Sequence, residues 1–119
     1  MKYSELVVWQ KAMDLVTEIY KITATFPSDE RFGLSSQARR TAVSIPSNIA
    51  EGHGRKATGA YINHLSIAYG SLVELETQIQ IAVRLNFVTL DESSHLLSTT
   101  DEIGKMLTGL RKSLAEKST

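Results

Sequence analysis

The chain has 119 residues and no cysteine, so it has no disulfide framework and no thiol nucleophile. Its length suits one domain, residues 1–119, that buries a shared core. The 13 basic and 13 acidic residues cancel, which argues against a protein devoted to nucleic acid, because such proteins carry a large basic excess. No apolar run approaches the roughly 20 residues of a membrane span, so we expect a cytoplasmic protein that does not contact a membrane.

The first helix is predicted from Ser4 to about Thr25. Ser4 can cap its start, and Pro27 cannot continue it. Its apolar residues cover about 200° of the circumference, roughly twice the stripe that one partner face needs. A short connection follows, and Ser35 or Ser36 is expected to cap the next helix.

The stretch from Ser36 to Arg55 is rich in small residues and is predicted to form a second helix, which Gly52 and Gly54 end before a tight turn. One half of its surface is apolar. The other half carries mostly short uncharged side chains, where a solvated face usually carries long charged ones. We therefore expect the polar half, including Ser44 and Asn48, to meet a partner at an oligomer interface. Pro46 removes the backbone hydrogen bond to the carbonyl four residues earlier, and a kink is expected there.

The third helix, about Thr58 to Asn86, has two apolar faces. Its main stripe is about 160° wide and suits the core of a bundle. A second patch, formed by Ile67, Ile81 and Leu85, lies apart from this stripe and beside Glu74. Because a four-helix chain offers only one core, the second patch is predicted to contact another subunit of a homo-oligomer.

The fourth helix is predicted from Thr89 to about Ala115. Thr89 and Glu92 form a capping-box pattern, in which each side chain accepts a hydrogen bond from the backbone amide of the other residue. The apolar stripe of this helix is only about 100° wide, as expected for an outer helix. Four helices with short connections favour an all-α fold, an antiparallel up-down-up-down four-helix bundle with the second helix kinked at Pro46.

The second helix and the loop after it carry the only local basic excess, a net +3. Arg39 projects toward the apolar half of its helix. Glu74 is predicted to form an ion pair with Arg39, or with Arg40, that fixes the register of two helices, with phosphate binding as the alternative role of the arginine. Arg55 and Lys56 follow a glycine turn and are candidates for nucleic-acid binding, together with Arg40. A merely solvated turn is the alternative for this loop.

No arrangement typical of an enzyme or of a metal site is found in the sequence. Ser44 and Ser47 have no histidine at helical spacing, and His53, His64 and His95 lack the spacing of metal ligands. We therefore expect a protein that is not an enzyme and that takes no cofactor, no metal and no small-molecule substrate.

Several strings of residues carry a family resemblance. The longest is Ser-Ile-Pro-Ser-Asn-Ile-Ala-Glu-Gly at residues 44–52, and others are Val-Trp-Gln-Lys-Ala-Met-Asp-Leu at residues 8–15 and Leu-Ser-Ile-Ala at residues 65–68. Over roughly residues 5 to 85, the chain resembles the bacterial four-helix-bundle family named for large-subunit ribosomal RNA intervening sequences. Members of that family were loosely labelled ribosomal proteins.

The resemblance implies a small antiparallel bundle that assembles into a ring, typically a pentamer. A related branch looks like the accessory protein of diversity-generating retroelements, which binds nucleic acid and a reverse transcriptase. That branch is strongly basic, whereas this chain is neutral. The predicted function is a non-enzymatic oligomeric scaffold that contacts RNA, DNA or a protein bound to them. The alternative is a structural or regulatory homo-oligomer with protein partners only.

Overall fold

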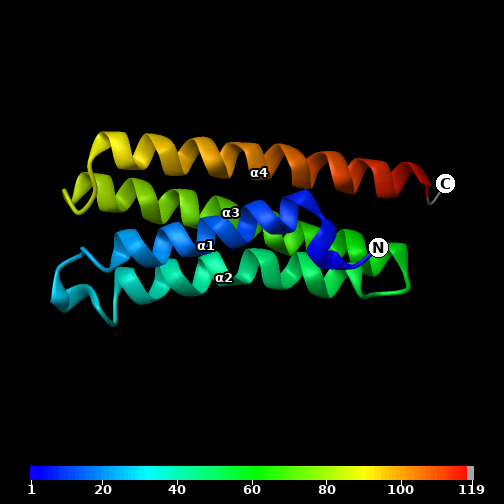
Figure 1. Ribbon diagram of the computed structural model, residues 1–119, viewed down its shortest axis with the longest axis horizontal. Helices are drawn as coiled ribbons and strands as arrows, with labels where there is room; N and C mark the ends of the chain where they lie inside the picture. Colours follow the sequence, from blue (N-terminus) through cyan, green and yellow to red (C-terminus); the bar gives the residue numbers. More distant parts are fainter. Residues whose placement is uncertain (118–119) are drawn as a thin grey trace.

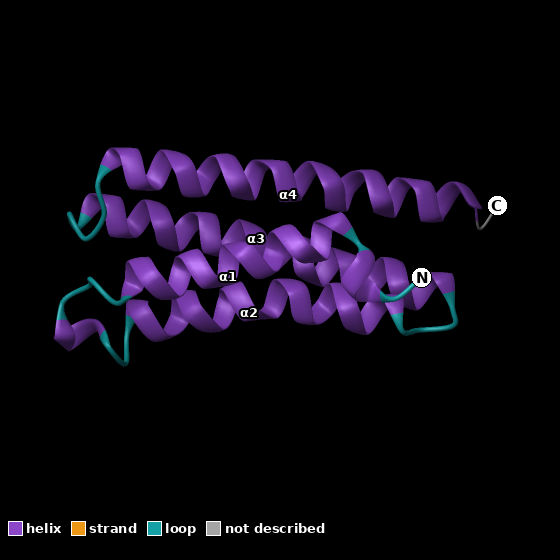
Figure 2. Cartoon of the chain, viewed as in Figure 1, coloured by secondary structure: helices purple, strands orange, loops and turns teal. Residues whose placement is uncertain are grey.

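The computed structural model describes residues 1–117, and every regular element in that range is helical (Figure 1). Two short 3₁₀ turns accompany four long α-helices, and no strand is present among these residues (Figure 2). The elements are η1 (Tyr3–Glu5), α1 (Val7–Thr23), η2 (Ser28–Glu30), α2 (Leu34–His53), α3 (Thr58–Arg84) and α4 (Leu90–Lys117). The predicted all-α four-helix bundle is confirmed.

The four helices lie side by side in an elongated molecule of 48 × 23 × 20 Å. Helix α1 packs against α2 and α4, and α3 packs against the same two helices. In Figure 1 the chain reverses its direction at each connection between helices, so the N-terminus and the end of α4 lie toward the same end of the molecule. No helix among residues 1–117 has the length and apolar character needed to cross a membrane.

One hydrophobic core runs between the helices, and all four supply it through their apolar stripes. Its largest fully buried aliphatic side chains are Leu15 and Ile19 from α1, Ile45 and Ile49 from α2, Leu65, Leu72 and Leu75 from α3, and Ile103 and Leu107 from α4. Each such side chain stabilises the fold by about 1.5–3 kcal/mol relative to an exposed one. Packing, more than local helix propensity, therefore holds the elements in place.

The starts of α1 and α2 differ from the sequence expectation. Ser4 lies in the turn η1, where its carbonyl accepts a hydrogen bond from Gln10 Nε2 at 2.9 Å, and α1 begins later without a side-chain cap. The start of α2 is capped from the preceding turn, because Glu30 Oε1 accepts from the Leu34 amide at 3.1 Å. The two serines that follow Leu34 therefore lie inside the helix rather than at its cap.

Two local hydrogen-bond patterns set the connection between α3 and α4. Asn86 adopts a left-handed conformation with φ 61°, and the Phe87 amide donates to the Ala82 carbonyl at 2.8 Å, which ends α3. The Thr89 amide then donates to Glu92 Oε1 at 2.9 Å, and the Glu92 amide donates to Thr89 Oγ1 at 3.1 Å. The predicted capping box is confirmed.

Helix α2 continues through Pro46, whose ring is buried in the bundle. Proline has no amide hydrogen, so the carbonyl four residues earlier receives no helical hydrogen bond at this point. Helical structure is nevertheless continuous from Leu34 to His53. The kink expected at Pro46 stays a prediction.

Candidate functional site

The polar half of α2 faces α3 of the same chain. Ser44 Oγ lies 2.7 Å from Ser71 Oγ, and Asn48 Oδ1 lies 3.1 Å from His64 Nδ1. Asn48 Nδ2 also donates to the Ser44 carbonyl at 2.9 Å. These groups are satisfied inside the bundle, so their polar character does not require the second subunit that the sequence led us to expect at Ser44 and Asn48.

At Gly52, helix α2 has no room for a side chain. A Cβ atom placed there would lie 2.7 Å from His64 Cβ and 3.0 Å from Tyr61 Cδ1. Both distances are shorter than the ~3.5–4.0 Å at which carbon atoms attract each other. Glycine is therefore needed for close packing against α3.

Burial at the same contact raises the pKa of Tyr61 above its ordinary value of 10.0.

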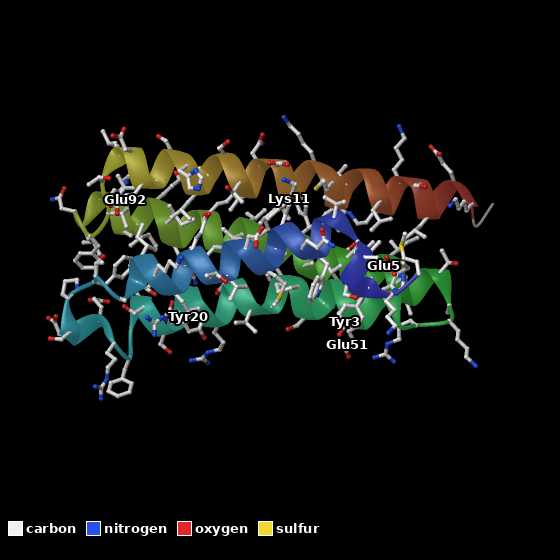
Figure 3. All side chains as sticks on the ribbon, viewed as in Figure 1. Tyr3, Glu5, Lys11, Tyr20, Glu51 and Glu92 are labelled. Atoms are coloured by element: carbon white, nitrogen blue, oxygen red, sulfur yellow. The ribbon has the colours of Figure 1, made fainter. Side chains whose placement is uncertain are left out.

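Arg39 points toward α1. Its Nε donates to Thr23 Oγ1 at 2.8 Å, its Nη2 donates to the Tyr20 carbonyl at 3.2 Å, and its Cζ lies 4.6 Å from the centre of the Tyr20 ring. Figure 3 shows Tyr20 on the α2 side of α1. The predicted Arg39–Glu74 ion pair is therefore wrong. Arg39 lies on the side of α2 that faces α1, whereas Glu74 lines a groove on the α3 side together with Arg40.

A groove of about 720 Å³ lies beside Arg39, bounded by the end of α1, the connection that follows it and the first half of α2. None of its 13 lining residues is acidic. We call it the arginine groove, after its three arginines, which it combines with three aromatic residues: Arg31, Arg39, Arg40, Tyr20, Phe26 and Phe32. The groove therefore places positive charge beside ring faces.

The contacts of the three arginines of the groove are mostly with uncharged groups, although Arg40 also lines the second groove that contains Glu74. Among residues 1–117 none of them forms an ion pair. Arg40 Nη2 donates to the uncharged Ser36 Oγ at 3.4 Å, and the Arg31 guanidinium lies 4.7 Å from the centre of the Phe32 ring. Because a guanidinium remains protonated at any physiological pH, all three positive charges are present in solution.

Sequence reasoning missed Arg31 and Phe32 as parts of a site. Phe32 is 84% exposed, which is unusual for a large apolar side chain. These residues become neighbours of Arg39 only when α1 packs on α2. The available signal was a cluster of arginines: Arg31 lies three residues before α2, and Arg39 and Arg40 lie in its second turn.

The residues predicted to bind nucleic acid do not form one site. Arg55 Nη2 lies 3.2 Å from Glu51 Oε1, so a carboxylate offsets its charge, whereas Lys56 is exposed on the loop after α2. Arg40 precedes Glu51 by 11 residues, or about 16 Å at the helical rise of ~1.5 Å per residue. Figure 3 shows Tyr20, in the arginine groove, and Glu51 toward different ends of the molecule. Arg40 therefore belongs to the arginine groove, and Arg55 and Lys56 form a separate, weaker basic spot.

The second apolar patch of α3 lies outside the bundle core. Ile67, Ile81 and Leu85 remain 42–51% exposed. Their spacing puts them within about 40° of one another around the helix, with Glu74 on the same face. We refer to these three aliphatic residues as the α3 patch. Its contact with a second subunit stays a prediction.

The described residues offer binding surfaces more than reactive groups. His64 Nδ1 is paired with Asn48 and not with a serine, and His95 Nε2 lies 3.2 Å from Glu18 Oε1 at the surface. Within residues 1–117 no group of three or more histidine, aspartate or glutamate side chains could hold a metal ion. The arginine groove and the α3 patch are the two surfaces whose chemistry favours a partner.

Known proteins agree with this fold. The family model described as 23S rRNA-intervening sequence protein matches residues 4–109. A crystal structure of a protein of unknown function, from the S23 ribosomal protein family of Bacteroides thetaiotaomicron, is also similar. The two chains are 26% identical and superpose with a TM-score of 0.84, over 94% of this chain and 99% of the other. No curated protein is significantly similar to the chain in sequence.

Proposed function

The chain belongs to the 23S rRNA-intervening sequence protein family, and we propose that it acts as a non-enzymatic homo-oligomeric scaffold that contacts RNA or DNA. One observation carries the proposal: a single small chain presents two separate exposed surfaces, the aliphatic α3 patch and the cationic arginine groove. The first suits a second copy of the chain, and the second suits an anionic polymer.

The α3 patch supports assembly. Its three aliphatic side chains are already half-buried, so covering the remainder would contribute roughly 1 kcal/mol each. Glu74 lies in the middle of this face, and a two-fold contact of the face with itself would bring two carboxylates together. A head-to-tail contact with a different surface avoids that repulsion and closes into a ring. The family resemblance likewise implies a ring, typically a pentamer.

The arginine groove supports contact with nucleic acid. Guanidinium groups match the geometry of phosphate oxygens and can bind them through two parallel hydrogen bonds. A ring would repeat the groove once per subunit, so weak local contacts along one polymer would add. The Arg55 and Lys56 spot would be repeated in the same way and is the competing location.

A homo-oligomer with protein partners only is the second candidate. The zero net charge of the chain favours it, because a neutral protein has no long-range field that attracts nucleic acid. The groove could then receive a carboxylate from a partner protein instead of a phosphate.

Light scattering on nucleic-acid-free protein tests assembly. A pentamer would have a mass of about 65 kDa, five times the 13.1 kDa of the chain. We expect Ile81→Glu to give a helical monomer, because assembly would bury an unpaired charge. Gln80→Glu places the same charge on an exposed neighbouring residue and should remain multimeric. A monomeric wild type, or an Ile81→Glu variant of wild-type mass, contradicts assembly through the α3 patch.

Binding of RNA and DNA by the same sample then separates the two candidates. Contacts to phosphates predict an affinity that falls steeply as salt rises from about 50 to about 200 mM. A multimer that binds neither polymer at the lower salt concentration supports the assembly with protein partners only.

A further inference from the structure

We propose that the arginine groove holds a single-stranded nucleic acid, with phosphates on Arg31, Arg39 and Arg40 and an unpaired base on Phe32. This inference rests on the proposed function and assigns the nucleic-acid contact to one site. It also moves that contact away from Arg55, which the chain itself pairs with a carboxylate.

Arg39 is held in position before a ligand arrives. Two of its five N–H groups donate to Thr23 Oγ1 and to the Tyr20 carbonyl, which leaves three for a ligand. Thr23 Oγ1 in turn donates to the Ile19 carbonyl at 2.6 Å, and the Tyr20 ring lies against the guanidinium. Because the side chain is already ordered, binding costs little of the rotamer entropy that a free arginine would lose.

Arg31 and Arg40 add positive charge, and no carboxylate lines the arginine groove; Glu74 lies with Arg40 in the separate groove on the α3 side. The acidic residues nearest in sequence are Asp29 and Glu30, and neither lines the groove. Glu30 Oε1 instead accepts the amide hydrogen of Leu34 at 3.1 Å. Three like charges around one groove repel one another, so an anion placed between them relieves that repulsion.

Phe32 distinguishes a single strand from other anions. Its ring is 84% exposed at the groove and has the Arg31 guanidinium 4.7 Å from its centre. An unstacked base can lie on such a ring, and stacking of one base strengthens binding by roughly 5- to 150-fold. The bases of a duplex are covered by their neighbours, and an acidic peptide would use the arginines but not the ring.

The size of the groove suits this occupant. Its volume of about 720 Å³ lies within the roughly 300–1,000 Å³ of pockets that hold small organic ligands. One nucleotide therefore fits between the arginines and the ring, while the strand continues along the surface in both directions. Nucleic-acid sites that ignore sequence combine the same two parts, a cationic track and an aromatic platform.

Fluorescence anisotropy with a labelled oligouridylate of about 6 nucleotides tests the site, because so short a strand reaches about one groove. The comparison probes are a DNA duplex and a polyglutamate peptide of similar charge. The groove variants are the double change Arg31→Gln/Arg40→Gln and the single change Phe32→Ala, all at exposed side chains. The matched control, Arg55→Gln/Lys56→Gln, removes the same charge from the other basic spot. Helical circular dichroism verifies that each variant is folded.

Three phosphate contacts to a single strand predict a slope of about −2 for log affinity against log salt, or about 18-fold weaker binding at 200 than at 50 mM. The double groove variant should keep one phosphate contact. Its slope should be about −0.7, so its affinity should fall less than 3-fold between 50 and 200 mM salt. Phe32→Ala should lower the affinity for the oligouridylate at least 5-fold and leave the affinity for the DNA duplex unchanged. The control variant should behave as the wild type.

Each outcome decides between the sites. If the control variant loses binding and the groove variants keep it, the arginine groove is not the site, although the proposed function survives. If the wild-type multimer binds no oligonucleotide even at low salt, the proposed contact with nucleic acid fails as well. Equal binding of single strand and duplex with no effect of Phe32→Ala, or tighter binding of polyglutamate, overturns the assignment to a single strand.

Discussion

Replacing Gly52 by alanine should destabilise the bundle, even though alanine is the better helix former. The new Cβ would lie 2.7 Å from His64 Cβ and 3.0 Å from Tyr61 Cδ1, both on α3. The His64 atom is next to the backbone and cannot rotate away. The two helices must therefore separate by about 1 Å to restore ordinary carbon–carbon contact.

The expected cost can be assembled from three terms. Overpacking of a well-filled contact costs about 1–3 kcal/mol. Separation of the helices would also weaken the hydrogen bond between His64 Nδ1 and Asn48 Oδ1, 3.1 Å long, which is worth about 1 kcal/mol. Against this, alanine gains up to about 1 kcal/mol of helix propensity over glycine. The variant should lose about 1–3 kcal/mol of unfolding free energy.

Gly109→Ala is the matched control, because a Cβ at Gly109 meets no atom within 4 Å. That variant gains helix propensity without a clash and should be about 1 kcal/mol more stable than the wild type. Thermal unfolding followed by circular dichroism, at one protein concentration, should separate the two variants by at least about 6 °C. A Gly52→Ala protein that unfolds at or above the wild-type temperature would refute the close approach of α2 to α3.

Three further changes test local features by urea unfolding. Thr89→Ala removes half of the capping box with Glu92 and should cost about 1 kcal/mol, whereas an unchanged midpoint would contradict the cap. Thr41→Val removes the nearer of the two acceptors of Gln78 Nε2, at 3.2 Å, and leaves Glu74 Oε1 at 3.5 Å, so it should cost about 1 kcal/mol; a neutral result would contradict the bond to Thr41. Burial raises the pKa of Tyr61 above 10.0. The free energy of unfolding should therefore be unaffected by this group below pH 10 and should fall as the pH rises through the pKa of the folded state. Tyr61→Phe should reduce this fall, and a pH profile identical to that of the wild type would contradict the burial of Tyr61.

Features that depend on spacing along one helix were predictable from the sequence. The capping box at Thr89 needs only the right residue three positions later, and the structure confirms it. The separation of Ile67 and Ile81 from the core stripe of α3 follows from the helical period alone, and both side chains remain exposed. Four apolar stripes joined by short connections left a helical bundle as the natural fold.

Features that depend on how two helices meet were not predictable. Arg39 was assigned to Glu74 because an antiparallel hairpin brings the two residues to one level of the bundle. The position of a residue along the bundle axis does not decide which neighbouring helix its side chain contacts. Arg39 projects to the α1 side of α2, where Thr23 and Tyr20 offer uncharged acceptors and a ring face. At that place the N–H groups of a guanidinium can find hydrogen-bond acceptors without a carboxylate. The expectation that Arg39 needs a partner therefore could not show which residue the partner is.

The same limit hid the arginine groove, because its residues come from two helices and from the connection between them. The charge of the segments along the sequence indicated a basic excess in the second helix. It could not show that Arg31, in the preceding connection, lies in the same groove as Arg39 and Arg40. The small residues of α2, Ser44 among them, were assigned to a subunit contact, and the structure gives them a second explanation in the packing of α2 on α3. Ser44 and Gly52 are small because α3 is close, and a chain packed tightly within itself has the same composition as one packed against a copy.

A net charge of zero does not argue against a local site for an anion. Salt screens the interaction between an anion and charges that lie farther away than about one screening length, so distant carboxylates contribute little. The screening length is about 8 Å at physiological ionic strength. Helix α4 carries five of the 13 acidic residues, Asp91, Glu92, Asp101, Glu102 and Glu116, and it packs on α1 and α3. Neighbouring helix axes are about 8–10 Å apart, so α2 and α4, on the diagonal, are separated by roughly 12–14 Å. An anion in the arginine groove therefore interacts mainly with the three nearby guanidinium groups, and the salt slope measures that local charge directly.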